Sequence, residues 1–170
     1  MSMLAAFPVA AQTPIPFRVG LSGVVSSGDD HNPGGPGWSL GALPSFDLQV
    51  GPRFFVGLGP QASVKLQSGA ANSQTTVILD LLFRLGWVWP VAERVQVYSY
   101  LAPGYSALFR EDRTFTLPTV GAHVGGALAL GRGVFGTLQL GYQLGWITDL
   151  GDSPRFLVRP GMAIGLLMQL

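Results

Sequence analysis

The sequence predicts an all-β protein, an eight-stranded antiparallel up-and-down transmembrane β-barrel, from three observations. Charged residues make up 11% of the 170 residues and hydrophobic residues 48%, whereas about 25% of an ordinary soluble domain is charged. No window of about 18 residues is uninterruptedly apolar, which excludes a transmembrane helix of the usual length. Eight segments instead alternate apolar and polar side chains, as a strand with two different faces does. Because only helices and closed barrels satisfy their backbone hydrogen bonds in lipid, the strands are expected to close into a ring.

The first four strands are expected over residues 16–27, 38–50, 54–67 and 75–90. The fourth, TTVILDLLFRLGWVWP, shows the pattern best: its largest apolar residues are odd-numbered, while Asp80 and Arg84 share the even-numbered face. A helix would pair these two charges across one turn, but on a strand they lie about 13 Å apart. Each therefore needs a counter-charge from another strand. We expect Asp47 to pair with Arg84 and Lys65 to pair with Asp80.

The last four strands are expected over residues 95–110, 119–130, 134–147 and 155–170. Longer polar loops follow the first, third, fifth and seventh strands, and tight turns follow the second, fourth and sixth. Short turns at one end and longer loops at the other are typical of outer-membrane barrels, whose short turns face the periplasm. Both termini are accordingly expected on the periplasmic side.

Aromatic residues lie near the ends of the expected strands, where amphipathic rings gather at the two membrane interfaces. Those at the loop ends are Trp38, Phe109, Trp146 and Phe156, and those at the short-turn ends are Phe17, Trp87 and Trp89. The core of a soluble β-sandwich would not require its aromatic residues at strand ends. We therefore interpret these residues as two aromatic girdles.

From residue 16 to residue 170 the pattern resembles the small eight-stranded outer-membrane β-barrels of Gram-negative bacteria, the OmpA-barrel and OmpX-like group. The closing segment carries a version of that group's assembly signal in Gly165, Met168 and Leu170. Two positions depart from the group's pattern, which mostly ends in an aromatic residue and has a polar residue where Ile164 stands. The resemblance implies insertion by the barrel-assembly machinery, an integral outer-membrane location, and contact with outer-membrane lipid and lipopolysaccharide. No peptidoglycan-binding module is expected after the barrel.

Residues 13–170 are expected to form one barrel domain. The preceding residues, MSMLAAFPVAAQ, have a short apolar core that ends in small residues, as the end of a secretory signal peptide does. They lack a basic beginning, so residues 1–12 are either a signal-peptide remnant or an ordinary N-terminal tail.

The polar face of the strands is expected to line the lumen. An eight-stranded barrel is just wide enough for side chains to fill it, and charges buried there must be paired or hydrogen-bonded. We expect a polar network of Arg18, Asp47, Lys65, Asp80, Arg84, Tyr98, Tyr100, Arg110, His123, Gln139, Gln143 and Arg159. The function that follows is structural, or an interaction with a protein partner through short extracellular loops. Because six bases (counting Arg155) face two acids within the strands, the alternative is a narrow channel with a basic, anion-preferring lumen.

The third hypothesis is an outer-membrane lipid-modifying enzyme, and the residues give this hypothesis little support. A serine hydrolase needs serine, histidine and an acid within hydrogen-bond reach, but the chain has only His31 and His123, and His123 is expected to point into the barrel. His31 follows Asp29 and Asp30 in a Gly- and Pro-rich loop, where solvated side chains are expected rather than a metal site. We expect no catalytic residues, no cofactor, no metal and no nucleic-acid binding.

Overall fold

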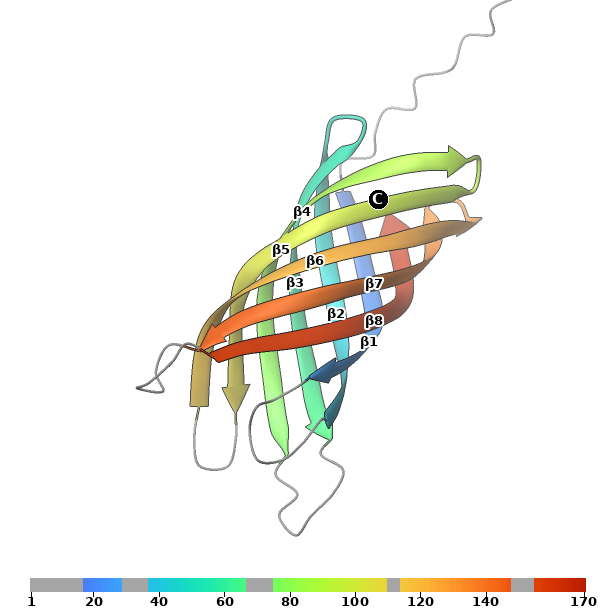
Figure 1. Cartoon of the computed structure of the whole chain (residues 1–170). Coiled ribbons are helices and arrows are strands. Elements are labelled where there is room, and N and C mark those ends of the chain that lie inside the picture. The colour runs from blue at the N-terminus through green and yellow to red at the C-terminus, as the bar shows by residue number, and fades with distance from the viewer. Residues whose placement is uncertain (1–16, 29–36, 67–74, 110–113, 148–154) are drawn as a thin grey trace, which may run out of the picture.

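The computed structural model describes residues 17–28, 37–66, 75–109, 114–147 and 155–170 (Figure 1). Their strands are β1 (Phe17–Gly28), β2 (Gly37–Val50), β3 (Phe54–Leu66), β4 (Thr76–Ala92), β5 (Val95–Phe109), β6 (Thr114–Gly131), β7 (Val134–Ile147) and β8 (Arg155–Gln169). Each strand pairs antiparallel with its neighbours in the chain, and β8 pairs with β1, so the sheet closes. The predicted fold class, a closed eight-stranded antiparallel barrel, is confirmed. Within the described ranges no helix is long and apolar enough to cross a membrane.

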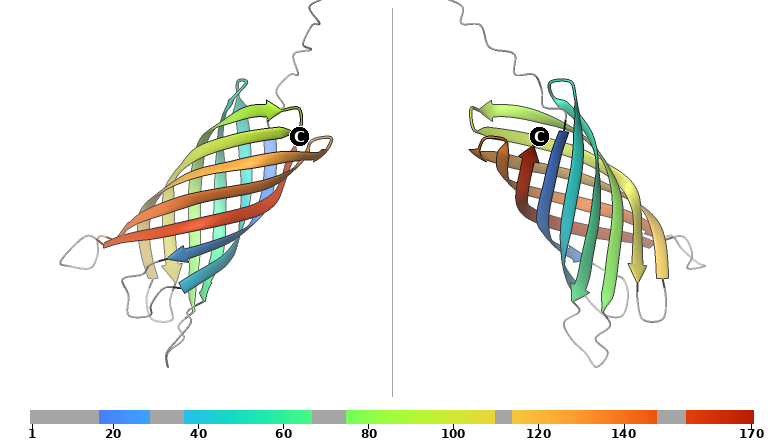
Figure 2. Two further views of the ribbon diagram at one scale, coloured as in Figure 1. Left: turned by 45° about the vertical axis from the view of Figure 1, so that its right-hand side comes forward. Right: turned by 180° about the vertical axis from the view of Figure 1, so that it is seen from behind.

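The two ends of the barrel differ in the length of their connections. Residues 51–53, 93–94 and 132–133 form tight turns, and Figure 2 shows all three at the end where β8 finishes. Gly51 and Gly133 adopt φ angles of 80° and 70° in two of these turns, a backbone conformation that glycine reaches without steric cost. We call this end the turn end, and the opposite end, where the longer connections leave the strands, the loop end.

Backbone hydrogen bonds join each tight turn to the strand that follows the turn's own hairpin. They run from Val88 N to Arg53 O at 2.8 Å, from Ala129 N to Arg94 O at 2.8 Å, and from Gln169 N to Gly133 O at 2.7 Å. At the seam between the last and first strands, Leu170 N donates to Phe17 O at 3.0 Å. The turn end is therefore bonded around its rim beyond the strand ladders themselves.

The strands agree with the predicted ranges within one or two residues at each end, except that β6 begins at Thr114 and not at residue 119. The sequence pattern treated Pro118 as part of a loop. In the structure Pro118 lies opposite Tyr105 in the β5–β6 ladder. Pro90, which was expected to end β4, lies beside a register shift that carries the strand on to Ala92. Proline lacks an N–H group, so it is accommodated in a sheet mainly at edges and bulges, and only the second case follows that rule.

The wall of the barrel has an apolar outer face and a mixed inner face. Along β4 the exposure alternates at every residue from Thr76 to Trp89. Leu81 and Phe83 are 51% and 53% exposed, whereas Asp80 and Arg84 are 3% and 6% exposed. Large apolar side chains are exposed in the same way on every strand. A soluble monomer rarely presents so extended an apolar surface to water, so this outer face is suited to lipid.

Glycines make room for the largest inward side chains. Phe55 lies opposite Gly86 in the strand register, and Tyr98 lies opposite Gly125. A Cβ atom on Gly125 would overlap the ring of Tyr98. The narrow lumen can therefore hold bulky side chains only where the neighbouring strand has none.

Candidate functional site: the side-chain-filled lumen

Most of the residues predicted to line the lumen are buried inside the barrel. These are Arg18, Asp47, Lys65, Asp80, Arg84, Tyr98, Tyr100, Gln139, Gln143 and Arg159. His123 lies on the same face of β6 and is partly exposed. Arg110 lies outside the described residues. The structure divides the lining into two groups of side chains, each built around one aspartate.

The Asp80 cluster comprises Asp80, Arg159, Ser106, Gln143 and Thr119, from β4, β8, β5, β7 and β6. Arg159 binds the carboxylate with both terminal nitrogens, Nη2 to Oδ1 at 2.8 Å and Nη1 to Oδ2 at 3.2 Å. Ser106 donates to Asp80 Oδ1 and accepts from Arg159 Nη2 at 2.9 Å. Gln143 Nε2 donates to Ser106 Oγ at 3.5 Å and to Thr119 Oγ1 at 3.4 Å. One acid and one base are thus matched within a fully buried polar group.

The cation that binds Asp80 differs from the predicted one. Lys65 was expected there, but β3 places Gln61 opposite Asp80 and Lys65 opposite Thr76. Lys65 is four residues farther along the strand than Gln61, about 13 Å away. Arg159 reaches Asp80 from β8, across the lumen.

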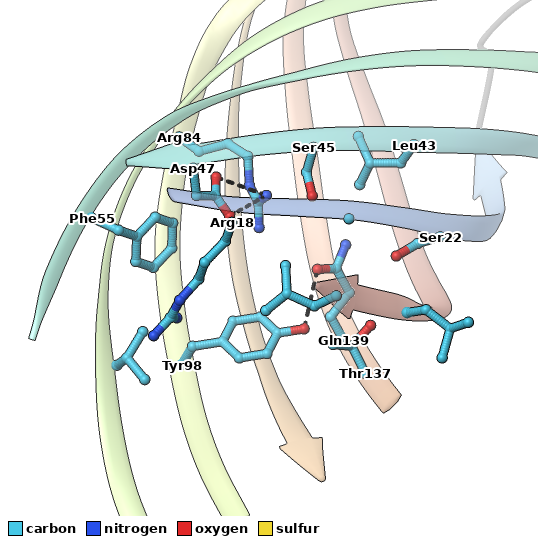
Figure 3. A pocket seen from close by; sticks show the side chains of 14 residues that line it. Arg18, Ser22, Leu43, Ser45, Asp47, Phe55, Arg84, Tyr98, Thr137 and Gln139 are labelled. Atoms are coloured by element: carbon cyan, nitrogen blue, oxygen red, sulfur yellow. Dashed lines mark hydrogen bonds and ion pairs between the residues drawn. The ribbon is translucent and has the colours of Figure 1, made fainter. Parts of the chain in front are cut away.

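The Asp47 cluster lies nearer the turn end and comprises Asp47, Arg84, Arg18 and Gln49. Figure 3 shows Arg84 directed at Asp47, with Nη1 donating to Oδ1 at 3.0 Å and Oδ2 at 2.9 Å. This is the expected Asp47–Arg84 pair. Arg18 extends away from the pair (Figure 3), and its Nη2 donates to Gln49 Oε1 at 2.9 Å. Gln49 in turn donates to Pro52 O at 3.2 Å, in the first tight turn.

An aromatic group packs against the Asp47 cluster. The guanidinium carbon of Arg84 lies 4.3 Å from the centre of the Tyr100 ring and 5.6 Å from that of Phe55, which places its charge where aromatic rings attract cations. His123 stacks on Tyr100 with ring centres 4.6 Å apart. The hydroxyl of Tyr100 donates to Gln139 Oε1 at 3.1 Å. Arg84 is therefore held by a carboxylate and by aromatic rings together.

Apolar side chains also face the lumen, and the sequence analysis did not assign them there. Near the loop end a buried aliphatic group consists of Ile78, Leu108, Leu117 and Leu157. Farther in are Val24, Leu43 and Ala163, and, beside the aromatic group, Leu82, Val88, Ala102 and Ala127. On β4 these residues have the same parity as Asp80 and Arg84, so the alternation itself could have identified them. The lumen is a mixed core, in which polar clusters alternate with apolar packing.

Three cavities in the described part of the interior are about the size of one or two water molecules. One of about 30 Å³ adjoins the Asp47 cluster, another of about 30 Å³ lies between His123 and Arg159, and one of about 10 Å³ lies near Lys65. A single water needs about 10–15 Å³ by this measure. Side chains thus occupy most of the described lumen.

The described residues do not assemble a recognisable catalytic or metal-binding set. They contain no group of three or more histidine, aspartate or glutamate side chains placed to hold a metal. Ser106, the buried serine bound to an acid, has Asp80, Arg159 and Gln143 as its partners in the described structure. A serine–histidine–acid relay needs a histidine at that position.

The predicted girdle residues whose side chains are described lie on the outer wall. Phe17, Trp87 and Trp89 near the turn end, and Trp38 and Phe109 near the loop end, are exposed. Trp146 is half-buried and lies opposite Phe156 in the β7–β8 register. Tyr105 and Tyr142, which the sequence analysis left out of the girdles, are each 62% exposed on the outer wall.

The residues of the expected assembly signal lie along the seam strand. Gly165 pairs with Ser22 across the β1–β8 seam. Met168 and Leu170 are exposed on the lipid-facing side.

The fold is that of small transmembrane β-barrels. The chain is similar to Neisserial surface protein A, with 12% identity, 91% of this chain and 97% of that chain covered, and a TM-score of 0.64. It is similar to the attachment invasion locus protein Ail of Yersinia pestis (12% identity, 90% and 97% covered, TM-score 0.54) and to a de novo designed transmembrane β-barrel (18% identity, 94% and 98% covered, TM-score 0.51). No protein-family model matches the sequence, and no curated protein sequence matches it significantly. The resemblance to eight-stranded outer-membrane barrels is thus supported by the shape of the whole chain.

Proposed function

We propose that this protein is an integral outer-membrane barrel with a closed lumen, whose role is to present its loop segments at the cell surface. The observation that carries the proposal is the combination of an apolar outer wall with an interior filled by side chains. The outer wall suits a lipid bilayer, and the filled interior leaves the external loops as the part free to meet a partner. The proposed barrel domain comprises residues 13–170.

The proposed orientation places the turn end and both termini in the periplasm and the loop end outside. Outer-membrane barrels have short periplasmic turns and longer external loops. In this orientation Gly165, Met168 and Leu170 form the strand that the barrel-assembly machinery would engage during insertion. Residues 1–12, which we expect to be either a signal-peptide remnant or an N-terminal tail, lie outside the described residues.

The charge of the loop segments narrows the choice of surface partner. Ail has been solved with sucrose octasulfate, a heparin analogue. The segments 29–36, 67–74, 110–113 and 148–154 of the present chain together hold six acidic and two basic residues. Such a surface repels a polysulfated ligand. The proposed partners are therefore a neutral or basic protein surface and the surrounding lipopolysaccharide, whose phosphates would need divalent cations to approach these acids.

A channel is the second candidate function, and the arrangement of the lumen argues against it. The Asp80–Arg159 pair joins β4 to β8 across the interior, and the Asp47–Arg84 pair joins β2 to β4 along the wall. The aliphatic group of Ile78, Leu108, Leu117 and Leu157 lies beyond them toward the loop end. An enzyme is not proposed, because the described residues assemble no serine–histidine–acid relay. Planar-bilayer recordings separate the candidates: we expect no steady conductance, and reproducible ion-selective openings would contradict the closed lumen.

The absence of cysteine from the sequence allows a direct test of surface presentation. Single variants Ser73→Cys in a loop segment and Glu93→Cys in a tight turn would be expressed behind a secretion signal in a Gram-negative host. Intact cells would then be treated with a membrane-impermeant maleimide. We expect Ser73→Cys to be labelled on intact cells and Glu93→Cys only after the outer membrane is permeabilised. Labelling of Glu93→Cys on intact cells would refute the orientation.

Heat-dependent migration of the detergent-solubilised protein in gels provides the companion test of a closed barrel. The unheated wild-type chain should migrate faster than the boiled one. A single unshifted band would contradict the barrel in the membrane, independently of which loops are outside.

A further inference from the structure

The Asp47 cluster contains more positive than negative charge. Arg18, Asp47 and Arg84 are 7%, 4% and 6% exposed. Both carboxylate oxygens of Asp47 accept from Arg84, while Arg18 donates to the neutral amide of Gln49. Of the described residues that line the adjoining cavity, Asp47 is the one acid. A buried charge without a counter-charge is costly, so the cluster is one negative charge short.

The cavity beside this cluster is lined partly by groups that donate hydrogen bonds and partly by apolar side chains. Its volume is about 30 Å³, and its walls include Arg18, Arg84, Ser22, Ser45 and Thr137 (Figure 3). The Nε atoms of both arginines are buried without a hydrogen-bond partner in the described part of the chain. Guanidinium N–H groups donate only, and hydroxyl groups can turn to donate. One negative charge in this cavity would balance the excess.

We propose that this cavity is a binding site for one small monatomic anion, a halide of the size of chloride, whose charge balances that of Arg18. A volume that suits about two waters admits a halide ion and is too small for sulfate or phosphate with their oxygens. The site goes beyond surface presentation, since it lies in the lumen and does not depend on the loops.

The anion would enter from the turn end. Arg18 is the second residue of β1, and its partner Gln49 reaches the carbonyl oxygen of Pro52 in an exposed tight turn. The apolar groups farther along the lumen separate this site from the loop end. The ion would therefore enter and leave at the turn end only. It would serve as a structural counter-charge and would not pass through the barrel.

The second 30 Å³ cavity supplies an internal control. It is lined by Arg159, Gln61, Gln139, Gln143 and His123, but Arg159 is matched by both oxygens of Asp80. With no excess charge, this cavity should hold water and not an anion.

The first test compares unfolding of the folded barrel in a neutral detergent with sodium chloride and with sodium gluconate, at matched ionic strength. Gluconate is too large for the cavity. We expect the urea midpoint, followed by tryptophan fluorescence, to rise with chloride and to saturate. The rise should vanish in Arg18→Met and persist in Arg132→Gln, which removes an exposed arginine in a tight turn. An equal midpoint in the two salts, or a chloride response that survives Arg18→Met, would overturn the site.

The second test needs no variant and so does not depend on whether Arg18→Met folds. Crystals of the wild-type barrel grown in sodium bromide should show one anomalous bromine peak in the cavity beside Arg18 and none beside Arg159. Water alone beside Arg18 at saturating bromide would refute the proposal. Neither result bears on the loop labelling experiment, so failure of the anion site and failure of the surface role are distinguishable.

Discussion

The Asp80 and Asp47 clusters each contain a buried arginine–aspartate pair, yet they differ in how the charge is balanced. In the Asp80 cluster one arginine meets one aspartate, and hydroxyl and amide groups complete the network. The Asp47 cluster contains a second arginine, Arg18, and the paired arginine, Arg84, also packs against aromatic rings. In the described structure the matched pair has no second arginine beside it, so we expect loss of its arginine to be the more damaging change. The Asp47 cluster contains a second cation, Arg18, opposite Asp47 in the strand register.

The largest expected effect comes from removing the arginine of the matched pair. Arg159→Met removes the arginine that binds Asp80 in the described structure, and loss of one partner of a buried pair costs about 3–5 kcal/mol. Arg84→Met should cost clearly less, because Arg18 lies opposite Asp47 in the strand register and can turn to it. Urea unfolding in detergent measures both. Equal losses would mean that Arg18 provides no compensation.

A double variant tests whether the loss arises from the unpaired charge. Asp80→Asn combined with Arg159→Met removes both charges and leaves only neutral groups in the cluster. We expect it to be about 1–3 kcal/mol more stable than Arg159→Met alone, since paired residues couple by such amounts. If the two substitutions simply add, the side chains matter for their packing and not for their charge.

The aromatic group that distinguishes the Asp47 cluster depends on glycine. Gly125→Ala places a methyl group against the ring of Tyr98 and the backbone of Leu138, and overpacking of this kind costs about 1–3 kcal/mol. The matched control is Gly126→Ala on the outer face, where a Cβ meets nothing closer than 3.9 Å. The same unfolding experiment compares them, and an equally small change in both would show that the ring has room to move.

The smallest expected effect concerns a single hydroxyl group. Tyr100→Phe removes the hydrogen bond to Gln139 but keeps the ring under Arg84, so the free energy of unfolding should fall by about 1 kcal/mol. Tyr105→Phe on the exposed outer wall should change it by less than about 0.5 kcal/mol. A larger loss at Tyr105 would indicate that its hydroxyl is anchored in the detergent or lipid interface.

The fold could be predicted because one simple rule acts on every strand. Parity alone separates the lipid face from the lumen face, as the alternation from Thr76 to Trp89 shows, and closure follows from the need to pair every strand edge. The pair of Asp47 and Arg84 was also within reach of the sequence. Gly57 on β3 lies opposite both residues, and glycine leaves room for them to meet.

The rest of the lumen depends on geometry that the sequence does not record. Arg159 meets Asp80 across the barrel, and which residues face each other there depends on the tilt and stagger of all the strands. The stacking of His123 on Tyr100 likewise arises from the space beside Gly141, its partner in register. The inward aliphatic residues were missed for a simpler reason: hydrophobicity was taken as the mark of the outer face, although Ile78 has the parity of Asp80.

The hydrogen bonds that leave the tight turns bear on how the turn end of the barrel resists fraying. The carbonyl groups of Arg53, Arg94 and Gly133 each accept from the strand that follows the turn's own hairpin. The bond from Leu170 N to Phe17 O adds the seam between β8 and β1. Opening one hairpin at this end therefore breaks a bond to the next strand as well.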